Sequence, residues 1–178
     1  MKVFLKNLDV ITIDIGLKGG ICHFKDNNIS FYSFPLKNKQ LDIIELSSLF
    51  DKIINYNTII VVEKQNAFPN QGVCSMFNLG KFYGIVLGLI SCKCLHKHNN
   101  NIYLINPQRW VRKLKVPSDK KSRVDILLND KFLHRYIKKS MFYTKRGALL
   151  DGYVDSALIL SYVISNLNQL DIALEKVL

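Results

Sequence analysis

The chain has 178 residues, of which 48% are hydrophobic, and a formal net charge of +11. This length and apolar content suit one domain with a full core, so we expect a single domain over residues 1–178. The first ten residues lack the apolar run of a signal peptide, and the apolar stretch around residues 82–92 is too short to span a bilayer. Four irregularly spaced cysteines do not suggest a disulfide framework. We therefore expect a soluble, intracellular protein in a reducing compartment.

Most of the positive charge lies in one segment. Residues 109–146 contain 13 Lys and Arg against three Asp, a net charge of +10, so the rest of the chain is nearly neutral. A solvated basic face explains many charge runs, but an excess this concentrated favours a phosphate backbone as the partner. Pro117 and scattered polar residues interrupt any amphipathic helix here, which disfavours a membrane surface. We expect nucleic acid, and no membrane, as the partner.

Apolar runs separated by turn residues predict three strands at the start of the chain. Residues 8–16 form a buried strand and are followed by Gly19 and Gly20 as a turn. Residues 21–25 and 29–34 are separated by polar turn residues and complete an antiparallel meander. The glycines also allow a ligand or another backbone to come close to the first strand.

The middle of the chain alternates between helix and strand. Residues 40–54 have helical apolar spacing, residues 57–63 form a β-branched strand, residues 72–94 a second helix and residues 102–107 a fifth strand. The remainder is expected to be helical with a basic middle. This order predicts an α/β domain with a mixed five-stranded sheet flanked by helices, in which the first and fourth strands lie side by side.

Four acidic residues occupy positions that such a fold can bring together. Asp14 and Glu63 end strands, while Asp151 and Asp155 lie one turn apart at the start of the apolar C-terminal helix. Carboxylates near apolar surface are costly unless a cation meets them, so the set suggests a divalent metal ion. The simpler alternatives are a turn aspartate at position 14, a solvated strand end at position 63 and a helix cap at position 151.

Aspartate followed by glycines after an apolar strand also opens the phosphate-binding loop of the actin and sugar-kinase fold. That fold resembles two such domains joined, and 178 residues provide room for one. The length of the chain therefore disfavours a kinase.

Five motifs in order carry a family resemblance: "DIGLKGG", "VVEKQNAFPNQGVCSMFNLGKFYG", "INPQRWVRKL", "DKKSRVD" and "DGYVDSALIL". Together they resemble the RuvC-type Holliday junction resolvases, particularly the compact phage-like branch. The resemblance implies a ribonuclease-H-like fold and a homodimer that cuts four-way junction DNA. It also implies two Mg²⁺ ions in each subunit, held by Asp14, Glu63, Asp151 and Asp155.

Two-metal hydrolysis of a phosphodiester needs an activated water on one side of phosphorus and a stabilised leaving oxygen on the other. The products expected from the resemblance carry 5′-phosphate and 3′-hydroxyl ends. Mn²⁺ is expected to substitute for Mg²⁺, and Ca²⁺ to bind without supporting cleavage. No small-molecule cofactor is expected.

The resemblance also implies residues that contact DNA. Lys121 maps onto a catalytic lysine near the scissile phosphate, and Arg112 onto a second basic position, although a generic solvated face is an equal alternative for both. The family's stacking aromatic is replaced by Asn66, and Phe68 is a candidate for its role. The full set of expected DNA-binding residues is Phe68, Gln71, Arg109, Arg112, Lys113, Lys115, Lys120, Lys121 and Arg123.

Two further patterns have simpler explanations. Gly80, Gly84 and Gly88 leave one groove of a helix without side chains, which suits packing against the sheet or another helix, with dimer contact as the alternative. The run "CKCLHKH" alternates Cys and His, but this spacing does not converge tetrahedrally on zinc.

The sequence therefore predicts a magnesium-dependent Holliday junction resolvase. The alternatives are another ribonuclease-H-like nuclease acting on branched DNA or an RNA–DNA hybrid, and a catalytically silent nucleic-acid-binding module.

Overall fold

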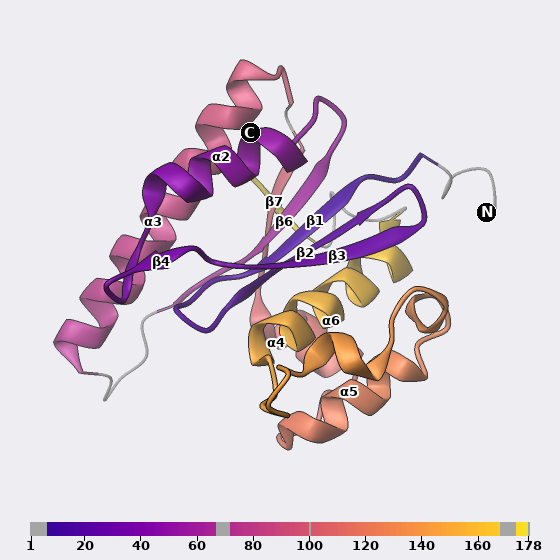
Figure 1. Ribbon diagram of the computed structural model, residues 1–178. Coiled ribbons are helices and arrows are strands. Elements are labelled where there is room, and N and C mark those ends of the chain that lie inside the picture. The colour runs from indigo at the N-terminus through magenta and orange to yellow at the C-terminus, as the bar shows by residue number, and fades with distance from the viewer. Residues whose placement is uncertain (1–6, 67–71, 100, 168–173, 178) are drawn as a thin grey trace.

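The protein folds around a sheet that begins with an antiparallel meander, as Figure 1 shows. The computed structural model describes residues 7–66, 72–99, 101–167 and 174–177. The meander consists of β1 (Val10–Asp14), β2 (Gly20–Lys25) and β3 (Asn28–Ser33). Asp26 and Asn27 join β2 to β3 with positive φ angles of 50° and 59°, which Asp and Asn tolerate better than most residues. The predicted meander is confirmed.

Parallel strands extend the sheet beyond β1. The strand β6 (Ile59–Glu63) pairs in parallel with β1, and β7 (Ile102–Ile105) pairs in parallel with β6. The two-residue strand β8 (Glu175–Lys176) adds an antiparallel edge, so the order is β3-β2-β1-β6-β7-β8. The expected neighbours β1 and β6 are confirmed. Within the described residues the sheet has six strands where the sequence predicted five, because a two-residue strand carries no periodic signal.

A small hairpin lies where the first helix was expected to begin. It consists of β4 (Leu36–Lys37) and β5 (Gln40–Leu41), and α2 (Ile43–Ile53) follows it. Asp42 caps α2, since its side chain accepts a hydrogen bond from the Glu45 amide at 3.0 Å. The cap fixes the start of the helix, so the prediction of helix at residues 40–42 was wrong.

Helices cover both faces of the sheet (Figure 1). On one face lie α2 and α3 (Val73–His96). The other face carries α6 (Asp151–Ser165), against which α4 (Pro107–Lys113) and α5 (Lys120–Leu128) pack. Short 3₁₀ turns at Leu133–Arg135 and Lys139–Phe142 complete that layer. The predicted α/β class, with helices on both faces, is confirmed.

Alternation along β1 decides which face each side chain meets. Ile11 and Ile13 are fully buried in the core that contains α2 and α3. Val10 belongs to the core under α6, and the Thr12 hydroxyl donates to the Ser156 carbonyl of α6 at 2.7 Å. Successive strand residues point to opposite faces, so the next even position, Asp14, is directed toward α6.

Helix α3 is only partly covered by the rest of the protein. Phe82, Val86, Ile90 and Cys94 recur every fourth residue and form its buried stripe. Among the described residues, α3 is the one helix that is long enough and apolar enough to cross a membrane, judged by length and composition alone. The expectation that this segment is too short to span a bilayer was therefore wrong. A single helix of this kind is weak evidence, because core helices of soluble proteins meet the same criteria.

Candidate active site

The carboxyl ends of β1 and β6 bring two acids together. Ile13 pairs with Val62, and Asp14 and Glu63 are the next residue of each strand. Glu63, like Asp14, faces α6. Alternate residues of a strand share a face, and Val61, two residues before Glu63, packs in the core under α6, while Val62 packs in the opposite core. Glu63 is 9% exposed. The pair predicted from strand order thus lies at the carboxyl ends of the two central strands, beneath α6.

The first turn of α6 contacts the β1–β2 turn directly through its backbone. Gly19 and Gly152 form a bridge between the β1–β2 turn and α6. A Cβ at Gly152 would lie 2.2 Å from the Gly19 carbonyl carbon and 2.4 Å from the Lys18 carbonyl oxygen. A Cβ at Gly20 would lie 2.6 Å from Gly152. The glycines therefore permit the close backbone approach that the sequence suggested, and the backbone that approaches is that of α6.

Asp151 and Asp155 project from α6 and meet two cations from α5. The Asp151 carboxylate accepts a hydrogen bond from the Lys120 ammonium. The Asp155 carboxylate accepts from Arg123 Nη1 at 2.7 Å and 3.0 Å, one bond to each oxygen. The N-cap of α6 is Leu150, which has no side-chain capping bond. The alternative that Asp151 serves as the helix cap is therefore not supported.

Burial and mutual repulsion raise the pKa of three of these acids. Burial, followed by the negative charges of Glu63 and Asp155, raises the pKa of Asp14 well above its usual 3.8. Burial also raises the pKa of Glu63, which shares a side-chain hydrogen bond with Asp14. The pKa of Asp155 is raised by burial in spite of the Arg123 guanidinium. The three carboxyls are close enough to oppose one another's ionisation, so a bound cation would relieve their repulsion.

Two neutral donors orient Glu63. The Trp110 indole Nε1 donates to Oε1 at 3.0 Å, and Gln65 Nε2 donates to Oε2 at 3.3 Å. Trp110 belongs to α4 and is 3% exposed. Sequence reasoning missed Trp110, and the available signal was a lone tryptophan in a basic segment directly after a strand. Its bond fixes the carboxylate at one angle, which a ligand of a metal ion needs.

The donor set fits Mg²⁺ by its chemistry. It contains carboxylate oxygens only, which hard cations prefer. Burial, with repulsion between neighbouring acids, raises the pKa of Asp14, Glu63 and Asp155, and a bound cation would favour their ionised forms. Among the residues that the structure describes, however, no three acidic, His or Cys side chains form a ready metal site. Lys120 and Arg123 instead contact Asp151 and Asp155. The four-carboxylate metal site stays a prediction.

The predicted basic residues divide into two groups. Lys120 and Arg123 reach the acids, whereas Lys121 is exposed and lies near Asp119. The pKa of Asp119 is lowered by hydrogen bonds from Ser122 and then by the charge of Lys121. The other basic residues predicted to bind DNA are exposed and lie on or just after α4: Arg109, Arg112, Lys113 and Lys115. Phe68 and Gln71 lie outside the described residues.

Comparison with known proteins places this arrangement in a structural context. No protein-family model and no curated protein matches the chain. Among solved structures, RuvC of Thermus thermophilus in complex with Holliday junction substrate matches with a TM-score of 0.56 and 10% identity, covering 96% of this chain and 100% of that one. The chain has the fold of RuvC.

Two further structures agree with this fold. A second Thermus thermophilus RuvC structure has a TM-score of 0.55 and 12% identity, over 96% of this chain and 100% of that chain. The yeast mitochondrial Holliday junction resolvase Ydc2 has a TM-score of 0.50 and 18% identity, over 87% of this chain and 77% of that chain. The predicted resemblance to RuvC is thereby confirmed for the ribonuclease-H-like fold. At sequence identities this low, structural similarity establishes the fold alone.

Proposed function

We propose that this protein is a metal-dependent Holliday junction resolvase that makes paired, symmetric incisions in four-way DNA. The observation that carries the proposal is that β1, β6 and α6 of a RuvC-like fold bring Asp14, Glu63 and Asp155 within electrostatic reach of one another. Asp151 lies one turn from Asp155 on α6, and the basic helix α5 contacts both. The Thermus thermophilus RuvC of the same fold was solved with a Holliday junction substrate. A net charge of +10 in residues 109–146 suits a phosphate backbone.

The residues that would hold two Mg²⁺ ions in each subunit are Asp14, Glu63, Asp151 and Asp155. When bound, such ions supply an activated water and stabilise the leaving oxygen, which yields 5′-phosphate and 3′-hydroxyl ends. Trp110 and Gln65 orient Glu63. Lys120 and Arg123 hold Asp151 and Asp155 through ion pairs. Both cations would be available to a DNA phosphate if these carboxylates held a metal ion instead.

The remaining basic residues are proposed to grip the DNA arms. Arg109, Arg112, Lys113 and Lys115 lie on the exposed side of α4 and its C-terminal end. Contacts of this type position the protein on the backbone without reading sequence. Phe68 and Gln71 are proposed to contact the junction DNA.

The motif and the structure point to two adjacent lysines for the position next to the scissile phosphate. The family resemblance implies Lys121, and the structure places Lys120 on Asp151. Lys120→Gln and Lys121→Gln remove one charge each from neighbouring positions, so they form a matched pair. The catalytic lysine is the one whose loss slows cleavage at saturating DNA. Loss of a lysine that only binds phosphate raises the DNA concentration needed for the half-maximal cleavage rate and leaves the maximal rate unchanged.

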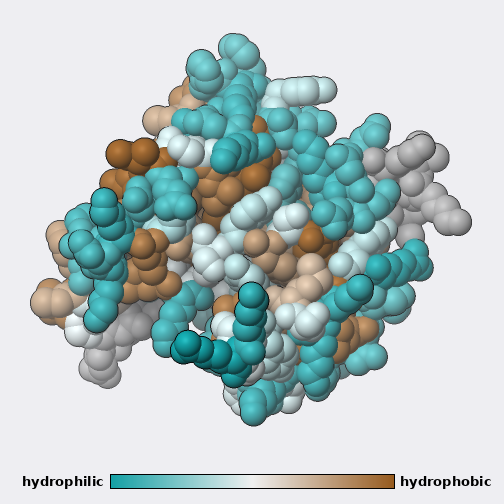
Figure 2. All heavy atoms as spheres, in the orientation of Figure 1, coloured by the Kyte–Doolittle hydropathy of each residue, from teal (hydrophilic) through white to brown (hydrophobic). Residues whose placement is uncertain are grey.

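We propose that two copies of the protein pair through the outer face of α3. Val73, Phe77 and Leu95 are 84%, 71% and 64% exposed on this helix. An added Cβ at Gly80, Gly84 or Gly88 would meet nothing within 4 Å. Figure 2 shows brown, hydrophobic patches among hydrophilic atoms on the α2 and α3 side of the molecule. An exposed apolar stripe with small residues at its centre allows close helix packing.

The dimer has a direct test. Phe77→Glu and Leu95→Glu together should convert a dimer into a monomer in light scattering and replace paired incisions by single nicks. A protein that is monomeric before substitution, yet cuts both strands together, would contradict the α3 dimer.

One observation favours a silent DNA-binding module as the second candidate. Lys120 and Arg123 neutralise Asp151 and Asp155 without any metal ion. Such a module would bind junctions and leave them uncut.

The discriminating experiment incubates the protein and Mg²⁺ with a four-way junction, a matched linear duplex and an RNA–DNA hybrid. Symmetric nicking of the junction alone supports the resolvase. Preference for the hybrid contradicts it in favour of another ribonuclease-H-like nuclease, and binding without cutting favours the silent module. Asp14→Asn is the control for a contaminating nuclease.

A further inference from the structure

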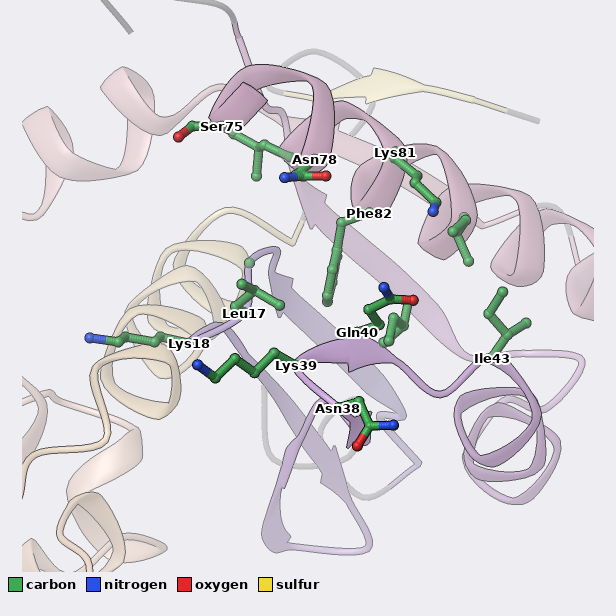
Figure 3. A pocket seen from close by; sticks show the side chains of 14 residues that line it. Leu17, Lys18, Asn38, Lys39, Gln40, Ile43, Ser75, Asn78, Lys81 and Phe82 are labelled. Carbon is green, nitrogen blue, oxygen red and sulfur yellow. The ribbon is translucent and has the colours of Figure 1, made fainter. Parts of the chain in front are cut away.

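A groove of about 780 Å³ lies beside the candidate active site. Its walls are the β1–β2 turn, the β4–β5 hairpin with the start of α2, and the first half of α3. Gly16, Leu17 and Lys18 follow the end of β1 and are separated from Asp14 by Ile15 alone, so one wall continues from the strand that carries a candidate metal ligand. Figure 3 shows Phe82 pointing from α3 into the space between that helix and the hairpin.

The lining of the groove combines positive charge with amides and apolar surface. Lys18, Lys39 and Lys81 come from three separate elements, and none of the described residues that line the groove is acidic. Asn38, Gln40 and Asn78 offer donors and acceptors for base edges. Leu17 and Ile43 are 56% and 45% exposed and supply apolar surface. This combination complements a chain of phosphates that carries flat, partly apolar bases.

We propose that this groove binds an unpaired DNA strand where it leaves the active site. The inference rests on the proposed function and adds a strand-binding site opposite the basic helices. Asp14 faces α6, and the turn that follows it carries the wall of a groove on the α2 and α3 side. A strand that crosses the β1–β2 turn therefore passes from the acids into the groove.

The size of the groove selects a single strand over a duplex. Its volume lies within the range of about 300–1,000 Å³ that is typical of small-ligand pockets. A few nucleotides fit such a space, while a double helix does not. Unpaired nucleotides occur at the branch point of an opened junction, so the groove would favour a junction over its separate arms.

The test compares two double variants that lose the same charge. Lys39→Gln with Lys81→Gln alters the groove, and Lys52→Gln with Lys176→Gln alters exposed lysines that do not line it. Binding of a labelled four-way junction is measured in Ca²⁺ by fluorescence anisotropy from 50 to 200 mM salt. A second junction carries four unpaired thymidines at the branch point. Thermal unfolding verifies that both variants are folded.

If the inference is correct, wild-type protein and the control bind the junction with unpaired thymidines more tightly than the paired one, and the groove variant loses that preference. The slope of log K against log salt should also fall by about 1.4, because each lysine–phosphate contact with a single strand contributes ~0.7. Equal binding by the two variants overturns the groove proposal, as does a changed oligomeric state with unchanged DNA affinity. Absence of junction cleavage by wild-type protein in Mg²⁺ contradicts the proposed function instead.

Discussion

Substituting Gly152 with Ala should separate α6 from the β1–β2 turn. The added Cβ would lie 2.2 Å from the Gly19 carbonyl carbon, 2.4 Å from the Lys18 carbonyl oxygen and 2.5 Å from the Gly20 nitrogen. All three are backbone atoms, so no flexible side chain can move aside. Ordinary contact begins at 3.4 Å, so the shortest distance must open by about 1 Å.

Such a shift has two measurable consequences. Overpacking of this kind costs about 1–3 kcal/mol, and for a chain of this length each kcal/mol lowers Tm by about 2–4 °C. Asp151 and Asp155 would also move relative to Asp14 and Glu63, and a displacement of about 1 Å can cost ~100-fold in rate. The assays are thermal unfolding and Mg²⁺-dependent nicking of a four-way junction, with DNA affinity measured in parallel.

Gly84→Ala is the matched control for thermal stability of the monomer, and it is not used in the nicking assay because Gly84 lies on the proposed α3 dimer face. It adds the same methyl group to an exposed helix position where nothing lies within 4 Å. Because Ala is favoured over Gly in helix interiors by about 1 kcal/mol, this variant should be as stable as wild type or more stable as a monomer. If Gly152→Ala unfolds at the wild-type temperature and nicks at the wild-type rate, the close approach of α6 does not position the acids.

Three further predictions concern the candidate active site, and a fourth concerns the buried Asp9. Asp14→Asn should abolish cleavage and leave junction binding intact, since the basic helices provide the DNA affinity. Loss of binding by the folded variant in an anisotropy assay would show that cleavage and DNA binding depend on the same residue. Trp110→Phe removes the 3.0 Å donor to Glu63 and should lower metal affinity about 10–100-fold, whereas unchanged Mn²⁺ affinity in calorimetry would deny Trp110 a positioning role. Mn²⁺ should replace Mg²⁺ in the nicking assay, and Ca²⁺ should bind without cutting; efficient cutting in Ca²⁺ alone would contradict the two-metal mechanism. Burial opposes ionisation of Asp9, but contacts with His23 at 2.8 Å, Lys25 and Asn55 outweigh the effect of burial and lower the pKa of Asp9 below 3.8. The Asp9 carboxylate therefore stabilises the fold fully above pH 3.8, and this contribution is lost as the pH falls through the lowered pKa. Asp9→Asn should therefore cost about 1–3 kcal/mol in urea unfolding at pH 7 and less at pH 3, and an equal loss at both pH values would contradict the linkage.

The sequence by itself determined the order of the main helices and strands. Apolar runs, turn residues and helical spacing are properties of short windows, so they predicted the meander, the parallel strands and the long helices. The same windows placed Asp14 and Glu63 at strand ends and Asp151 and Asp155 on one helix turn. Because β1 and β6 were expected to be neighbours, the meeting of the first two acids followed from strand order.

Only the tertiary structure decided which side chains meet those acids. Adjacent residues on a helix point about 100° apart, so the orientation of α5, and not its sequence, brings Lys120 to Asp151 and leaves Lys121 near Asp119. Trp110 reaches Glu63 from an element 47 residues away in the chain. The groove and the exposed face of α3 likewise depend on how hairpin, turn and helix pack together. Long-range packing has no signature in a local window, and it decided the surroundings of an acid set whose positions the sequence had already indicated.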